Sequence, residues 1–188
     1  MEYSNSKVGG VLFFMATTQF VLGIIVAEAL YPGYSISKNE ISYLGIGPSA
    51  MVFNTSIFLL GLLIIVGTYF LQRAFNIKIL TVLLTLMAVG FMGISIFTHN
   101  SYSIHFIFAV FAFLFGGLST IYSSKLMKLP ISLINVLLGL MTLSASVLYL
   151  VKQYLGLGAG GMERMMVYPI LIWTIGFGSY LIALPEKS

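Results

Sequence analysis

Residues 97–109 read FTHNSYSIHFIFA and contain both histidines of the chain, His99 and His105. The stretch begins as a short polar turn, and long apolar runs lie on both sides of it. A polar turn between two such runs is typical of a tight hairpin between membrane-spanning helices. We therefore expect the chain to cross a membrane, turn at this point and cross back.

The composition supports a membrane protein. Of the 188 residues, 59% are hydrophobic and only 7% are charged, whereas a soluble domain carries roughly 25% charged residues. The chain has no cysteine, which excludes disulfides and thiolate metal sites. Its net charge of +4 is not gathered into any basic run, so we expect no nucleic-acid partner.

Six apolar runs are long enough to span a bilayer, which takes about 20 residues. Because lipid offers the backbone no hydrogen-bond partners, each run should form a helix. The sequence predicts an all-α fold, a polytopic transmembrane bundle of six helices in one domain, residues 1–188. The predicted helices are 8–30, 50–71, 77–97, 104–122, 131–151 and 165–184.

The orientation follows from lysines and arginines in the short loops, which are enriched on the cytoplasmic side. Six of the nine fall on one predicted side: Lys7, Arg73, Lys78, Lys125, Lys128 and Lys187. The other three are Lys38, Lys152 and Arg164. We therefore predict a multi-pass protein of the cell membrane with both termini in the cytoplasm.

The predicted outer side collects the unusual polar residues. Both histidines lie there, together with Glu28, Glu40 and Glu163, which are three of the five acidic residues. The outer connection 152–164 also holds four glycines, at positions 156, 158, 160 and 161. We expect that glycine-rich segment to be a flexible connector, and we expect any site to lie on this side.

Arg164 needs an acidic partner if the end of its helix is buried. Its neighbour Glu163 points to a different helix face, so Glu28 or Glu40 is the expected partner. Such a pair would tie the first and last helices together. Alternatively, the Arg164 guanidinium would hold a phosphate or carboxylate of a lipid headgroup, because its planar N–H donors match the paired oxygens of such groups.

The histidines allow several kinds of chemistry. His99, His105 and one glutamate would make a two-histidine, one-carboxylate zinc set, but no HExxH spacing supports it. We therefore predict no metal and no cofactor, and we favour a hydrogen-bonded or proton-handling His105. A serine, histidine and acid site could use Ser42, Ser101 or Ser103, although no nucleophile elbow marks any of them.

Three short patterns occur together in this chain. The first is NEISYLG at 39–45, followed by Asn54 and Gly61. The second is Phe97 with His105, Ala109 and Phe113. The third is the pair Glu163 and Arg164, followed by Tyr168, Pro169 and Trp173. With six apolar runs, they resemble the small membrane proteins grouped as domain of unknown function 998. That group is distantly similar to six-helix proteins of the Frag1, DRAM and Sfk1 type, some of which act in lipid remodelling.

Our leading hypothesis is an outward-facing polar pocket that binds or remodels a lipid headgroup. The candidate catalytic residues are His105, Glu28 and Glu163, and the candidate ligand-binding residues are Arg164, Glu40, Asn54 and His99. A second hypothesis is an accessory or assembly subunit of a larger membrane complex, and a third is a metal-dependent membrane hydrolase. The expected partners are therefore membrane lipids or other membrane-protein subunits, and whether the protein is an enzyme stays open.

Overall fold

The computed structural model describes residues 4–185, and this part of the chain contains six α-helices and no β-strand. The helices are α1 (Asn5–Leu30), α2 (Ala50–Phe75), α3 (Lys78–Ile96), α4 (Tyr102–Ser123), α5 (Ile131–Leu150) and α6 (Gly158–Ala183). All six are long and apolar enough to cross a membrane. The predicted six-helix transmembrane fold is confirmed, and the chain is a multi-pass membrane protein. Which side of the bundle faces the cytoplasm stays a prediction.

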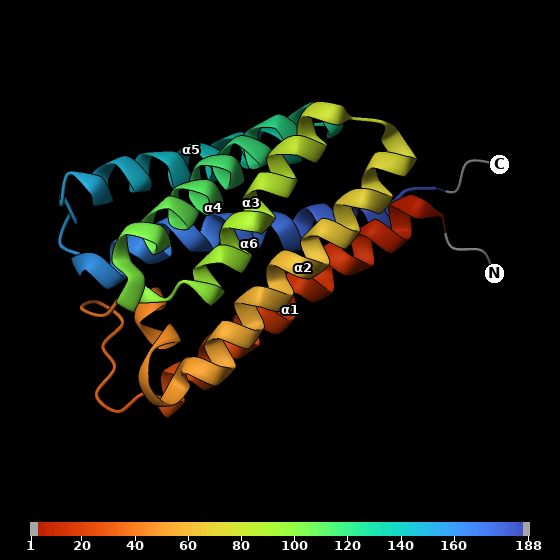
Figure 1. Ribbon diagram of the computed structural model, residues 1–188. Coiled ribbons are helices and arrows are strands. Elements are labelled where there is room, and N and C mark those ends of the chain that lie inside the picture. The colour runs from red at the N-terminus through yellow and green to blue at the C-terminus, as the bar shows by residue number, and fades with distance from the viewer. Residues whose placement is uncertain (1–3, 186–188) are drawn as a thin grey trace.

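The helices form a bundle in which each packs against the next along the chain, and α6 packs back against α1 (Figure 1). Three connections therefore meet at one end, which we call the polar end: residues 31–49, 97–101 and 151–157. The first of these holds the 3₁₀ turns η1 (Ile41–Gly45) and η2 (Gly47–Ser49), and the second holds η3 (His99–Ser101). A fourth turn, η4 (Ser124–Leu126), follows α4 at the opposite end.

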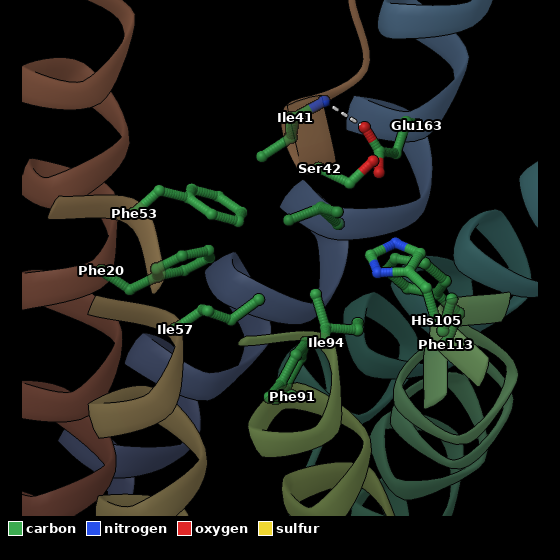
Figure 2. A pocket seen from close by; sticks show the side chains of 12 residues that line it. Phe20, Ile41, Ser42, Phe53, Ile57, Phe91, Ile94, His105, Phe113 and Glu163 are labelled. Carbon is green, nitrogen blue, oxygen red and sulfur yellow. Dashed lines mark hydrogen bonds between the residues drawn. The ribbon is translucent and has the colours of Figure 1, made fainter. Parts of the chain in front are cut away.

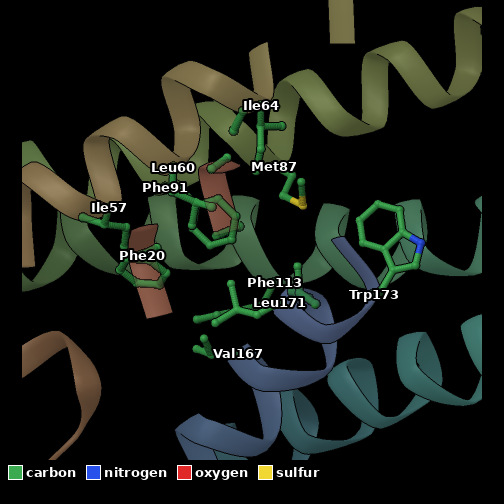
Figure 3. Close-up of a cluster of buried hydrophobic side chains, with 14 of the residues drawn as sticks. Phe20, Ile57, Leu60, Ile64, Met87, Phe91, Phe113, Val167, Leu171 and Trp173 are labelled. Atoms are coloured by element: carbon green, nitrogen blue, oxygen red, sulfur yellow. The ribbon is translucent and has the colours of Figure 1, made fainter. Parts of the chain in front are cut away.

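Buried apolar side chains from α1, α2, α3, α4 and α6 fill the interior of the bundle (Figure 3). The largest is Trp173, which is 2% exposed and donates from its indole nitrogen to the Ser123 hydroxyl at 2.8 Å. The outside of the bundle is also apolar, as Leu22 and Ile25 on α1 illustrate. This combination is expected when lipid rather than water surrounds the bundle.

The start of α6 corrects the prediction of a flexible connector. The helix begins at Gly158, so Gly160 and Gly161 are helical. Gly160 donates its backbone N–H to the Ser37 carbonyl at 3.0 Å. A Cβ atom at Gly160 would lie 2.1 Å from the Asn39 carbonyl oxygen. The glycines therefore let the 31–49 connection lie directly on the first turn of α6.

Gly90 on α3 allows the close approach of α4. A Cβ atom there would lie 2.3 Å from the backbone nitrogen of Ala112 and 2.8 Å from its Cα atom. Backbone atoms cannot move aside as a flexible side chain can. The contact is thus of the small-residue kind that brings membrane helices together.

We predict that Gly90→Ala lowers the free energy of unfolding by about 1–3 kcal/mol, the usual cost of overpacking. Gly176→Ala is the matched control, because a Cβ atom at this α6 position meets nothing within 4 Å. Thermal unfolding of the two purified variants in detergent is the measurement. Equal melting temperatures would contradict the close packing of α3 on α4.

Candidate functional site

Arg164 is a buried cation in the second turn of α6, with a side chain that is 7% exposed. Its Nη2 atom donates to Glu28 Oε1 at 2.6 Å and to the Tyr34 hydroxyl at 3.0 Å. The ion pair joins the end of α1 to the start of α6. Glu28, rather than Glu40, is therefore the acidic partner that the sequence required.

The other terminal nitrogen of Arg164 holds the 31–49 connection. Nη1 donates to the carbonyl oxygens of Ile36 at 2.9 Å, Asn39 at 3.3 Å and Gly160 at 2.9 Å. Tyr34 adds a further link, since its hydroxyl donates to the Glu40 carbonyl at 3.0 Å. Burial raises the pKa of Tyr34 to about 12, so this hydroxyl keeps its proton at neutral pH.

Glu163 points to a different part of the polar end from its neighbour Arg164. Its carboxylate accepts hydrogen bonds from the backbone N–H groups of Ile41 and Ser42, at the start of η1. The residue is 8% exposed. Two successive residues of α6 therefore fix the same connection, one through its carbonyl oxygens and the other through its N–H groups.

His105 is 8% exposed on the first turn of α4. Its Nδ1 atom lies 2.8 Å from the Phe97 carbonyl oxygen. Because a carbonyl only accepts, Nδ1 carries the hydrogen, and Nε2 of the neutral ring is an acceptor. The turn also brings His99 close, with ring centroids 5.9 Å apart for the two histidines and 4.3 Å apart for His99 and Tyr43.

A pocket of about 450 Å³ lies between α4, α5, α6 and the 31–49 connection. Its polar lining gathers at the polar end of the bundle: Glu40, Ser42, His99, His105, Tyr149 and Glu163. Tyr149 donates its hydroxyl hydrogen to the Glu40 carboxylate. The rest of the lining is mainly apolar and includes Phe106, Val110, Phe113, Leu143, Val147 and Met166. The pocket is thus polar at one end and apolar along its length.

A second, smaller cavity of about 30 Å³ adjoins the pocket on the side of α1 and α2 (Figure 2). Ser42, His105 and Glu163 line both spaces. Figure 2 shows the three side chains pointing into the small cavity, opposite Phe20 and Phe53. Its size is enough for one or two water molecules, so this polar group lies where a buried water could contact it.

A family model described as Protein of unknown function (DUF998) matches residues 14–180. The chain belongs to the DUF998 family. No curated protein and no solved structure matches it. The resemblance that the three sequence patterns indicated is therefore confirmed, while the similarity to Frag1, DRAM and Sfk1 proteins stays a prediction.

The pocket of this DUF998 protein brings together four of the seven residues that the sequence proposed: Glu40, His99, His105 and Glu163. Glu28, Asn54 and Arg164 are not part of its lining. Asn54 instead donates from its amide to the Gly45 carbonyl at 3.0 Å. These three residues hold the 31–49 connection or the ends of helices in place beside the pocket.

Tyr149 is a pocket residue that sequence reasoning missed. It lies three residues after Ser146 on α5, and both side chains face the pocket. Residues three apart on a helix lie on the same face. Two polar residues at this spacing, near the predicted outer end of an apolar run, could therefore have indicated a polar face at this end of α5. Within residues 4–185, no group of three or more histidine or acidic side chains is placed to hold a metal ion.

We predict that Glu28→Gln lowers the free energy of unfolding of this DUF998 protein by about 3 kcal/mol, because Arg164 would lose its counter-charge while still buried. Lys38→Gln, a change of an exposed charge in the same connection, is the control and should have little effect. Unfolding of both variants in detergent is the measurement. A Glu28→Gln variant as stable as Lys38→Gln would show that the ion pair does not hold the fold.

Proposed function

We propose that this protein binds a membrane lipid in the pocket between α4 and α5, with the lipid headgroup at the polar end. The observation that carries the proposal is the distribution of the lining residues. Carboxylates, histidines and hydroxyls occupy one end, and apolar side chains form the remaining walls. A lipid has the same division between a polar head and an apolar chain.

The dimensions of the pocket support this orientation. Its lining on α4 extends from Tyr102 to Leu114, which at 1.5 Å per residue is roughly 18 Å along the helix. Its volume of about 450 Å³ is within the usual range of ligand pockets, roughly 300–1,000 Å³. An acyl chain lying along the helices would therefore leave its headgroup at the helix ends, where membrane meets water.

The lipid would reach the pocket from the side. Several lining side chains are also exposed on the outside of the bundle, including Val110, which is 38% exposed, and Val147, which is 60% exposed. Of the six helices, α5 has the smallest share of its span buried, at 22%. The pocket wall between α4 and α5 is therefore in contact with the surface that faces lipid.

The headgroup would lie against two groups that accept protons, His105 Nε2 and the Glu163 carboxylate. These residues are the candidates for proton transfer if the bound lipid is remodelled. Arg164 has a different task in this proposal. Both its terminal nitrogens already donate to protein acceptors, so it positions the connection that carries Glu40 and Ser42.

We predict that Ala109→Trp reduces the amount of lipid that co-purifies in mild detergent by at least half, because Ala109 lines the pocket and a tryptophan would fill part of it. Ile107→Trp is the matched control on the same helix, since Ile107 is 53% exposed and outside the lining. Native mass spectrometry of the two variants gives the number of bound lipids.

Equal lipid retention by the two variants would contradict the proposal. The same spectra test the alternative of an accessory subunit. A stoichiometric protein partner together with no retained lipid would favour that alternative over lipid binding.

A further inference from the structure

We infer that the pocket selects amphiphiles whose headgroup carries a primary ammonium, and that it discriminates against anionic headgroups. The inference rests on the proposed lipid site and specifies the chemistry of its ligand. Its basis is the juxtaposition of two carboxylates with the Nε2 atom of His105 at the polar end of the pocket.

The polar end offers several acceptor positions that no donor in the described part of the chain uses. An ionised carboxylate has about four positions for accepting hydrogen bonds, of which Glu40 uses one for Tyr149 and Glu163 uses two for backbone N–H groups. His105 donates through Nδ1 to Phe97, so Nε2 remains an acceptor. Within residues 4–185, no hydrogen bond engages Nε2.

Two of the four hydroxyl groups in the lining already donate their hydrogen to protein acceptors. Tyr149 donates to Glu40, and Ser146 donates to the Thr142 carbonyl at 2.8 Å. The open acceptor positions on Glu40, Glu163 and His105 therefore favour a ligand that supplies several donors. An ammonium group supplies three, and a phosphate at neutral pH supplies few or none.

The charge of the pocket lining also favours a cationic headgroup. Among the described residues, the lining contains two glutamates and no lysine or arginine. The nearby cation, Arg164, is paired with Glu28 and with three carbonyl oxygens outside the lining. A positive headgroup would reduce the repulsion between Glu40 and Glu163, whereas an anionic headgroup would increase it.

The test uses three amphiphiles that share a tetradecyl chain and differ in the headgroup: tetradecylamine, tetradecyltrimethylammonium and tetradecyl phosphate. Equal concentrations compete for the purified full-length protein in a neutral detergent at pH 7, and native mass spectrometry counts the bound molecules. We expect tetradecylamine to be bound at least tenfold more than tetradecyl phosphate. Tetradecyltrimethylammonium should fall between them, because it carries the charge without N–H donors.

Glu40→Gln and Glu163→Gln test the residues themselves. Each should reduce the tetradecylamine preference several-fold, because an amide keeps the shape of the side chain and removes its charge. Glu40 is only partly buried, so its variant remains informative if Glu163→Gln fails to fold. Lys38→Gln, a charge change in the same connection outside the lining, should leave the preference unchanged.

The outcomes separate this inference from the lipid site itself. Binding of tetradecyl phosphate or tetradecyltrimethylammonium as tightly as the amine, with loss of that binding in Ala109→Trp, would overturn the inference and leave the site intact. An unchanged preference in Glu40→Gln and a folded Glu163→Gln would overturn it too. If none of the three amphiphiles binds, or if Ala109→Trp binds them all normally, the proposed lipid site itself is contradicted.

Discussion

A buried guanidinium must be surrounded by acceptors, because an isolated charge away from water is very costly. The two terminal nitrogens of Arg164 meet this requirement with Glu28, the Tyr34 hydroxyl and three carbonyl oxygens, whereas its buried Nε atom has no partner among residues 4–185. Two of those carbonyls belong to the connection between α1 and α2, so satisfying one cation also fixes the path of a long segment. The arrangement of the polar end depends on this requirement.

The fixed path of that connection creates the pocket. It places Glu40 beside Tyr149 of α5 and places Ser42 beside Glu163 of α6. The same segment covers the first turn of α6, where Gly160 leaves room for its backbone. Acidic and hydroxyl groups from α1–α2, α5 and α6 therefore meet the histidines at the start of α4. The result is a polar end on an otherwise apolar pocket, which is the feature that supports lipid binding.

The six helices could be predicted from sequence because a bilayer requires long apolar runs with internally satisfied backbones. The pair of Arg164 with Glu28 was one of two predicted choices, since a cation at a buried helix end requires an acid. The helical state of Gly160 could not be predicted, because it depends on carbonyl oxygens more than a hundred residues away in the chain. The contact of Tyr149 with Glu40 depends likewise on how α5 is placed against the first connection.

The most direct test of lipid binding in this pocket is a cryo-electron microscopy structure of the protein in lipid nanodiscs. We predict elongated density between α4 and α5 that ends in a headgroup beside Glu40, Glu163 and His105. Arg164 should be paired with Glu28 in the same map. Lipid binding in this pocket would be contradicted by a map in which α4 and α5 close the pocket. It would also be contradicted if Glu40 and Glu163 face away from each other and no density lies between the helices.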